Sequence, residues 1–172
     1  MSRRWLLTLP LAATLLLGAC GGGGDDDAEN PSEETAAADQ TTQARGPGLP
    51  TPTPVADEGI AVTVIGNGTT YQPTVAEFRQ LPTVQIEADG TRTGPTLDVV
   101  ASQVGWNEST VVTIQGLTED LNNVAYIRYP LADIAQDTIL EVDEQGHLNL
   151  YSTVLPKDDW LKVVVAITLT DG

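Results

Sequence analysis

The sequence predicts an α+β domain built on a mixed or antiparallel sheet with two short helices. Segments rich in β-branched residues outnumber the helical segments, and turn residues follow most of them. Only two segments carry clear helix-start signals. The expected strands are residues 60–65, 69–72, 83–89, 110–115, 124–129, 138–142, 147–154 and 160–169. The expected helices are residues 75–81 and 97–104, with one further helical turn at 131–135.

Both helices are expected to begin near a threonine. Thr74 and Glu77 form a capping box, in which each side chain satisfies a free backbone N–H of the other residue. The second helix begins at Thr96 or Pro95, and Gly105 is expected to end it in the left-handed conformation.

Glycine and polar residues separate the expected strands. Gly66-Asn67-Gly68 is a tight-turn signal, and Asp89-Gly90 is another. Residues 143–146 are expected to close a hairpin.

The first nineteen residues have the pattern of a secretory signal peptide. Arg3 and Arg4 supply a positive start, and an apolar run over residues 5–17 is too short to span a bilayer as a helix of ~20 residues. The run ends in Leu17-Gly18-Ala19-Cys20, which resembles the lipobox of bacterial lipoproteins. The alternative is an ordinary signal peptide with a chance cysteine. The paired arginines also resemble a twin-arginine export signal, and the route of export stays open.

The lipobox resemblance implies that acyl chains such as palmitate are attached to Cys20. Two or three chains anchor a protein stably, because each buried methylene contributes ~0.8 kcal/mol. The expected location is therefore outside the cytoplasm, tethered to the cell membrane or to the outer membrane.

Residues 20–59 are expected to be the lipidated cysteine and a disordered linker, with the folded domain over residues 60–172. The linker is rich in glycine, acidic residues and proline, and has little apolar surface to bury. Asp25-Asp26-Asp27 lacks the spaced ligands and glycine turn of a calcium loop, so a tether is favoured over a calcium site.

Charge and composition exclude several classes of function. The formal net charge is −16, and loss of a leader with two of the eight basic residues leaves six against 24 acidic residues, or −18. Such a surface repels phosphate backbones, so no nucleic-acid partner is expected. One cysteine and one histidine exclude a disulfide framework, a thiolate metal site and any site that needs two histidines.

The order of motifs resembles the sulfite-oxidase-type molybdopterin-binding oxidoreductase domain, in its small, stand-alone, often exported members. Residues 74–82 resemble its "ltlaeLralP" helix, and residues 93–100 resemble its "W-x-G-v-x-L-x-d-v-L" segment. Residues 138–148 resemble its later hairpin, and residues 160–168 resemble its terminal strand. The resemblance covers most of residues 60–172.

The chain departs from that family where the family holds its cofactor. In catalytic members the strand after the first helix carries the cysteine that binds molybdenum, and the matching residues 84–89 contain none. The arginine-bearing loop that follows is shortened to residues 90–92. Nine of the 24 acidic residues precede residue 60, so fifteen remain in the domain beside three arginines. We expect no bound cofactor and no metal, with molybdopterin held without a cysteine as the alternative.

Three residues are weak candidates for binding a cofactor, namely Arg92, Tyr126 and Arg128. By the period of two along a strand, Tyr126 and Arg128 share one face, which could line a pocket. The alternative is a half-exposed sheet face with an arginine stacked on a tyrosine. No catalytic residue is predicted.

Five other residues are expected to be structural. His147 follows a turn glycine and is expected to be solvated. Trp106 and Trp160 are expected to be core or rim anchors. Glu87 and Asp89 are expected to share a strand face, but paired carboxylates without a cleft indicate no acid–base chemistry.

These observations favour a membrane-anchored binding or interaction module with a degenerate molybdopterin-binding-like domain, rather than an enzyme. An exported redox protein or another envelope protein is the expected partner. The alternatives are a molybdopterin oxidoreductase and a purely structural envelope lipoprotein. Neither the ligand nor the oligomeric state follows from the sequence.

Overall fold

The computed structural model describes the backbone of residues 41–44 and all of residues 51–172. The predictions for the leader, for Cys20 and for most of the linker lie outside the described residues. None of the helices within these ranges is both long enough and apolar enough to cross a membrane.

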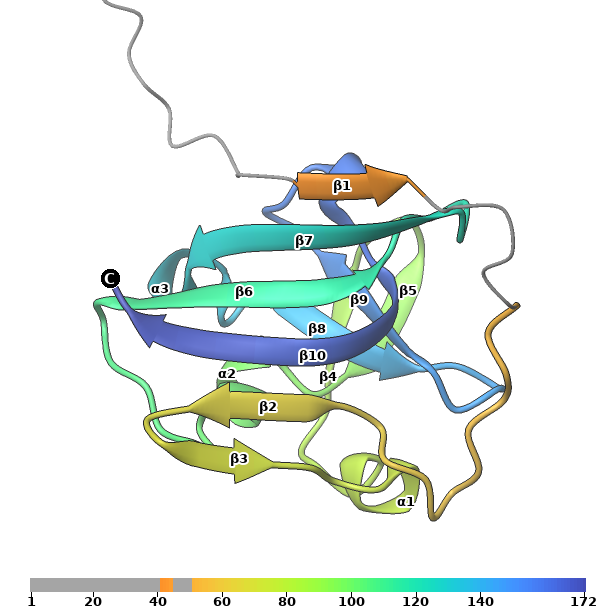
Figure 1. The fold of residues 1–172 in the computed structure, drawn as a ribbon, viewed down its shortest axis with the longest axis horizontal. Coiled ribbons are helices and arrows are strands. Elements are labelled where there is room, and N and C mark those ends of the chain that lie inside the picture. Colours follow the sequence, from red (N-terminus) through yellow and green to blue (C-terminus); the bar gives the residue numbers. More distant parts are fainter. Residues whose placement is uncertain (1–40, 45–50) are drawn as a thin grey trace, which may run out of the picture. The chain divides into compact units, whose positions relative to one another are not determined.

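A six-stranded sheet forms one layer of the domain (Figure 1). Strand β10 lies inside it, pairing in parallel with β2 and antiparallel with β6, while the remaining pairs are antiparallel. The predicted α+β class with a mixed sheet is therefore confirmed. In spatial order the strands are β1 (Thr41–Ala44), β7 (Asn123–Pro130), β6 (Thr110–Leu117), β10 (Lys162–Asp171), β2 (Thr63–Gly66) and β3 (Thr69–Tyr71).

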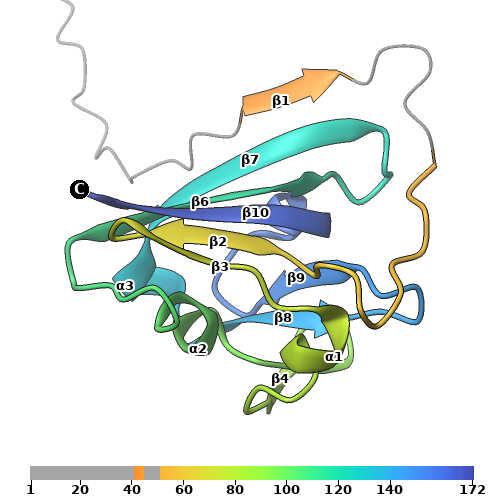
Figure 2. The ribbon, with the colours of Figure 1, turned by 60° about the horizontal axis from the view of Figure 1, so that its bottom comes forward.

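Two hairpins and the short helices form the second layer. Figure 2 shows α2, α3, β8 and β9 together on one side of the six-stranded sheet. The hairpins are β4 (Val84–Glu87) with β5 (Thr91–Gly94), and β8 (Thr138–Val142) with β9 (Leu148–Ser152). The helices are α1 (Val75–Phe78), α2 (Leu97–Ala101), α3 (Leu131–Ile134) and the 3-10 turn η1 (Lys157–Asp159).

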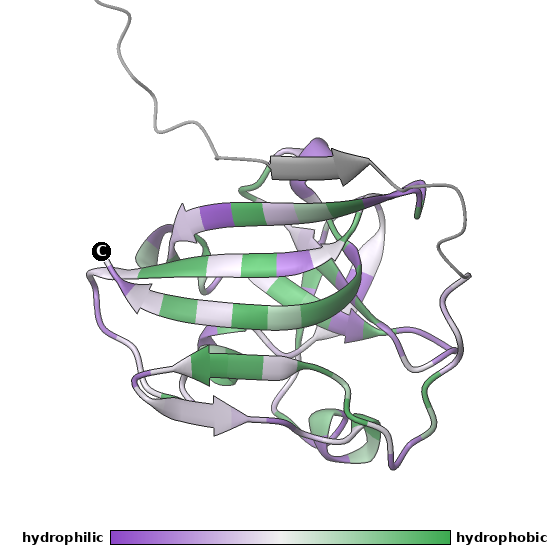
Figure 3. Cartoon of the chain, in the orientation of Figure 1, coloured by the Kyte–Doolittle hydropathy of each residue, from purple (hydrophilic) through white to green (hydrophobic). Residues whose placement is uncertain are grey.

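The core lies between these layers. Along β6 every second residue is buried, so one face of the strand packs inward and the other stays partly exposed. Figure 3 shows hydrophobic bands separated by polar bands along β6 and β7. Sheet residues such as Ile114 and Ile167 join Leu97 and Leu150 of the second layer in one buried cluster.

Both helices begin as the sequence predicts but end earlier. The backbone N–H of Glu77 donates to Thr74 Oγ1 at 3.2 Å, and Glu77 Oε2 accepts the Thr74 N–H at 2.9 Å. After Phe78 the chain tightens into i→i+3 bonds, such as Leu81 N–H to the Phe78 carbonyl at 3.1 Å. The second helix tightens in the same way before Gly105, whose φ of +78° confirms the predicted left-handed residue.

The three predicted turns are confirmed. Asn67 (φ +52°) and Gly68 (φ +71°) connect β2 and β3. Asp89 and Gly90 connect β4 and β5, both with positive φ. Gly146, at φ +82°, lies in the β8–β9 turn.

The ordered domain begins before residue 60, in contrast to the predicted boundary. Residues 51–59, here called the strap, bond to two separate parts of the domain. The Val55 N–H donates to the Gln145 carbonyl at 2.7 Å. The Asp57 and Gly59 carbonyls accept the first two N–H groups of α1 at 3.0 and 2.9 Å. Because these helix donors have no partner within the helix, the strap is stabilised by backbone bonds although it has little apolar surface.

Candidate binding site beside Tyr151 and Lys162

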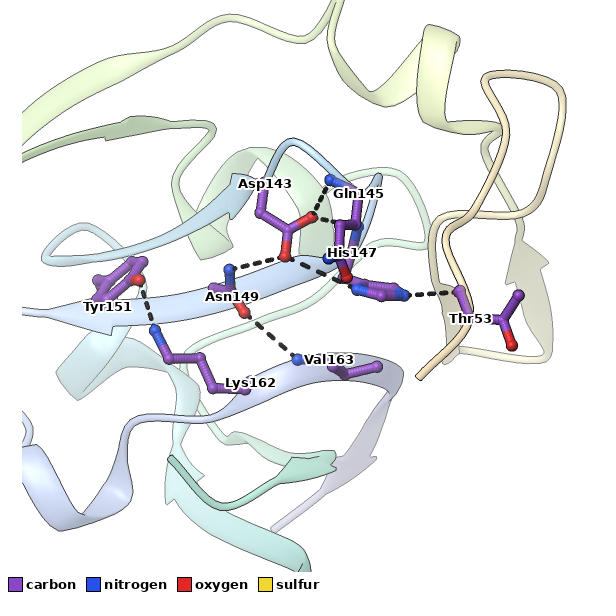
Figure 4. Close-up of polar contacts among 8 residues, drawn as sticks. All are labelled: Thr53, Asp143, Gln145, His147, Asn149, Tyr151, Lys162 and Val163. Carbon is purple, nitrogen blue, oxygen red and sulfur yellow. Dashed lines mark hydrogen bonds and ion pairs between the residues drawn. The ribbon is translucent and has the colours of Figure 1, made fainter. Parts of the chain in front are cut away.

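The β8–β9 turn is organised by Asp143. Its Oδ1 atom accepts the N–H groups of Gln145 at 2.8 Å and His147 at 2.9 Å (Figure 4). The Asp143 carbonyl accepts the Gly146 N–H at 3.2 Å. An aspartate that bonds the backbone two residues ahead is a common way to fix a turn. Asp143 Oδ2 lies 3.5 Å from Asn149 Nδ2, so the same side chain reaches into β9.

His147 is buried, with 5% of its surface exposed, and the prediction that it is solvated is wrong. Its Nε2 atom lies 2.8 Å from the Thr53 carbonyl, and Nδ1 lies 3.7 Å from Asp143 Oδ2 (Figure 4). Because a carbonyl oxygen only accepts, Nε2 carries the hydrogen of this bond. The strap covers the imidazole, and this long-range contact cannot be read from the turn sequence.

Gly146 allows the strap to approach the turn. A Cβ atom built on Gly146 would lie 2.3 Å from the Val55 carbonyl oxygen, far inside van der Waals contact. The positive φ of this residue also favours glycine. The lack of a side chain and the positive φ of Gly146 together allow the strap to lie directly over the β8–β9 turn.

Tyr151, on β9, is surrounded by cations and an aromatic ring. The Arg92 guanidinium carbon lies 4.4 Å from the centre of the Tyr151 ring, and Lys162 Nζ lies 4.6 Å from it. Lys162 Nζ also donates to the tyrosine oxygen at 2.6 Å (Figure 4). Trp160 packs edge-on against the same ring, with centroids 5.4 Å apart. Cation–π attraction and the hydrogen bond together fix the position of the Lys162 ammonium.

Lys162, at the start of β10, differs from the basic residues of the second layer because no carboxylate lies within 4 Å of its ammonium. Arg92 pairs with Glu141 at 3.4 Å, Lys157 pairs with Asp89 at 2.8 Å, and Arg79 pairs with Asp57. Among residues 51–172, Lys162 and Arg128 are the two basic residues with no ion pair. Arg128 lines a cavity of about 230 Å³, whereas Lys162 lines a larger one, of about 370 Å³, together with polar side chains of the turn.

A cavity of about 370 Å³ opens on the Lys162 side of this group. The strap, the β8–β9 turn, the loop after β6 and the start of β10 form its walls. Pro52, Leu121 and Val163 give it apolar surface, and Glu119 adds a carboxylate on the wall supplied by the loop. The lining is Thr51, Pro52, Glu119, Leu121, Asp143, Gln145, His147, Asn149, Lys162 and Val163.

Val163 holds an unusual backbone conformation beside Lys162. Its φ is +48°, which is an outlier for a β-branched residue. The register of β10 against β6 shifts between Lys162 and Ala166, and the Val163 N–H donates to Asn149 Oδ1 at 3.4 Å. Strained residues of this kind cost about 1–3 kcal/mol and gather at functional sites. Here the irregularity directly follows the lysine that lines the cavity.

Two buried donors beside Tyr151 have no hydrogen-bond partner. They are Arg92 Nε and Trp160 Nε1, and no other buried side-chain N or O of residues 51–172 shares this property. Buried polar atoms in proteins are nearly always paired. The surroundings of Tyr151 are therefore rich in hydrogen-bond donors within an acidic chain.

The structure separates the three residues predicted as cofactor ligands. Arg92 lies on β5 beside Tyr151. Tyr126 and Arg128 share the less buried face of β7, opposite the buried Ala125 and Ile127, and do not line the cavity. Sequence reasoning missed Tyr151 and Lys162, because no local motif links two residues eleven positions apart on different strands.

The two tryptophans and the two carboxylates that were expected to be structural lie outside the cavity beside Lys162. Trp160 is 8% exposed and belongs to the core, and Trp106 packs against the core from its rim, which confirms both predictions. Glu87 is exposed and accepts a hydrogen bond from Thr91 at 3.0 Å. Asp89 lies in the turn rather than on the strand, so it does not share a strand face with Glu87.

The sequence resemblance pairs strand β4 with the strand that carries the metal ligand in the molybdopterin family, but β4 offers no soft donor. It offers the exposed side chains of Gln85 and Glu87, which are harder donors than a thiolate. No group of three or more His, Cys, Asp or Glu residues in the described part is placed to hold a metal ion.

Comparison with known proteins gives no relative from which a function of this site could be inferred. No protein-family model matches the chain, and no curated protein matches it. What the site offers a ligand is an ammonium in a fixed position, hydrogen-bonding groups of the β8–β9 turn and a small apolar surface.

Proposed function

We propose that this protein is an exported lipoprotein, anchored through Cys20 to the cell membrane or the outer membrane, whose domain is a binding module. Its fold would be that of the sulfite-oxidase-type molybdopterin-binding domain without the metal ligand. Its ligand carries one anionic group, a carboxylate or a phosphate, which binds Lys162 in the cavity beside the β8–β9 turn.

The unpaired Lys162 ammonium is the observation that supports this proposal. A cation within an acidic chain gains most from a neighbouring carboxylate, yet the described residues place none within 4 Å of Lys162. Within residues 51–172 its hydrogen-bond partner is the Tyr151 hydroxyl, which is neutral and leaves the charge uncompensated. Hydrogen bonds to charged groups contribute about 1.5–3 kcal/mol, and a ligand anion would supply the missing partner.

The other walls limit the chemistry of the ligand. Glu119 and Asp143 would repel a second anionic group, so a ligand with a single anionic end and hydrogen-bond donors fits best. A volume of about 370 Å³ suits a small molecule or the end of a larger one. Pro52, Leu121 and Val163 would contact its apolar part.

The test measures anion binding by the full chain in detergent, using calorimetry or NMR shifts of residues around the cavity. The probes are a series of monocarboxylates and inorganic phosphate. We expect wild type to bind at least one probe, and the Lys162→Gln variant to bind it at least about 10-fold more weakly. The Arg128→Gln variant makes the same change in net charge at an exposed position outside the cavity, and should bind as wild type does. Equal binding by wild type and Lys162→Gln, or no binding of any probe by wild type, would reject the proposal.

A molybdopterin oxidoreductase is the second candidate, and the paired Arg3 and Arg4, which resemble a twin-arginine export signal, favour it. We expect elemental analysis of protein purified from its native host to show no molybdenum. Neither side chain on β4 that could reach a metal is soft, and both Gln85 and Glu87 point to solvent. Stoichiometric molybdenum in the folded protein would support the enzyme instead.

A further inference from the structure

A second cavity, of about 410 Å³, lies at the opposite end of β10 from Lys162. It is formed where the β2–β3 turn, the loop after α2 and the end of β10 meet. Gly68 and Gly105 line it, both with positive φ, and a Cβ on Gly105 would lie 3.4 Å from the Asn67 amide nitrogen. Two residues without side chains thus help to keep the cavity open.

Trp106 supplies the aromatic surface of this cavity. The indole is half-buried against the core, and its Nε1 donates to Asp98 Oδ1 at 3.1 Å. This bond satisfies the only polar atom of the side chain and holds the ring in one orientation. The ring therefore presents apolar surface rather than a hydrogen-bonding group to a ligand.

The polar groups around the ring are amides, hydroxyls and one carboxylate. Asn107 Oδ1 accepts the Ser109 N–H at 2.9 Å and the Ser109 hydroxyl at 2.6 Å, which leaves its amide Nδ2 without a partner among the described residues. The side chains of Asn67 and Asp171 likewise form no hydrogen bond within residues 51–172, and both line the cavity. Donors and acceptors are therefore both available, and the lining includes no cation.

We propose that this second cavity binds a neutral carbohydrate. A pyranose ring has an apolar C–H face that stacks on an indole, and hydroxyl groups that both donate and accept. The amides of Asn67 and Asn107 would donate to sugar oxygens, and the Asp171 carboxylate would accept from a hydroxyl. The carboxylate and the absence of any lining cation disfavour anionic ligands. A quaternary ammonium such as choline is also disfavoured. Its recognition uses a cage of several aromatic rings, whereas this cavity has the single indole of Trp106.

This inference is independent of the proposed anion site, because the two cavities share no residue. A membrane-tethered domain with both sites would bind a charged small molecule at one end of β10 and a glycan at the other.

The experiment titrates the full chain, in a detergent without a sugar headgroup, with cellotriose, maltotriose and chitotriose. Calorimetry and saturation-transfer NMR detect binding, and choline chloride is titrated in parallel. We expect at least one trisaccharide to bind and the Trp106→Ala variant to bind it at least about 10-fold more weakly. The Lys162→Gln variant should bind it as wild type does.

Two variants keep the test valid if Trp106→Ala does not fold. Asn107→Asp retains the oxygen that accepts from Ser109 but removes the Nδ2 donor, and Asn67→Gly is compatible with the φ of +52° at that position. Each should weaken saccharide binding several-fold. The proposal is overturned if no trisaccharide binds wild type, if these variants bind as wild type does, or if choline binds in preference to every saccharide.

Discussion

Replacing Gly146 with alanine should detach the strap from the β8–β9 turn. The new methyl group would lie 2.3 Å from the Val55 carbonyl oxygen, whereas ordinary contact begins near 3.4 Å. Because that oxygen belongs to the backbone, the strap has to move away. The movement would break the Val55–Gln145 bond of 2.7 Å and the Thr53–His147 bond of 2.8 Å.

The expected magnitude has two parts. A non-glycine residue in the left-handed region costs about 1–2 kcal/mol, and each lost hydrogen bond costs about 0.5–1.5 kcal/mol. With two hydrogen bonds lost, the sum is a loss of about 2–5 kcal/mol in the free energy of unfolding for Gly146→Ala. Gly68→Ala is the matched control, because Gly68 has a φ of +71° but a Cβ there would meet no atom within 4 Å. Gly68→Ala should lose only the backbone contribution of about 1–2 kcal/mol in the free energy of unfolding.

Urea unfolding of the two variants and of wild type measures this difference, and hydrogen exchange reports the Val55 amide. We expect the Val55 amide to lose its protection in Gly146→Ala and to keep it in Gly68→Ala. The reasoning would be refuted if both variants lost the same free energy within about 0.5 kcal/mol while Val55 stayed protected in each.

Three further predictions address single features. Thr74→Ala should cost about 1 kcal/mol of stability in urea unfolding, because the N–H of Glu77 loses its acceptor, whereas Thr74→Ser should cost little. The hydrogen bond and charge of Lys157 lower the pKa of Asp89. The Asp89–Lys157 pair therefore stabilises the fold fully at a pH above the ordinary aspartate pKa. This contribution to stability is lost as the pH falls through the lowered pKa. Lys157→Met should therefore raise the pKa of Asp89 in an NMR titration, and an unchanged value would contradict the assignment. A Cys20→Ser variant should remain unprocessed or be released in soluble form, and fractionation with membranes after removal of the leader would place the anchor elsewhere.

Local signals in the sequence predicted most of the elements. The capping box at Thr74, the turn at Asn67 and the left-handed Gly105 each depend on neighbours within a few residues, and all three occur as expected. The ends of the helices were predicted too late, because a periodic apolar pattern does not distinguish an α-helix from the i→i+3 turns that follow it.

The candidate site was largely not predictable, because it forms from distant segments. Composition correctly describes the strap as poor in apolar residues, but its order comes from backbone bonds to Gln145 and to the start of α1. His147 looks like a solvated turn residue until the Thr53 carbonyl lies over it. Arg92 was predicted as a weak candidate for binding a cofactor, while its position beside Tyr151 depends on the packing of two separate hairpins.

The place of β10 in the sheet has a consequence for how the domain folds. It lies between β6 and β2, yet it follows every other strand of that sheet in the sequence. Among the described strands, the β2–β3 hairpin pairs with the rest of the sheet only through β10, by a parallel pairing that spans about a hundred residues. The β2–β3 hairpin therefore cannot pair with the rest of the sheet until β10, residues 162–171, has been synthesised. We expect folding in one late, cooperative step rather than strand by strand, and a chain that stops before β10 should leave two sheet edges open to association with other molecules.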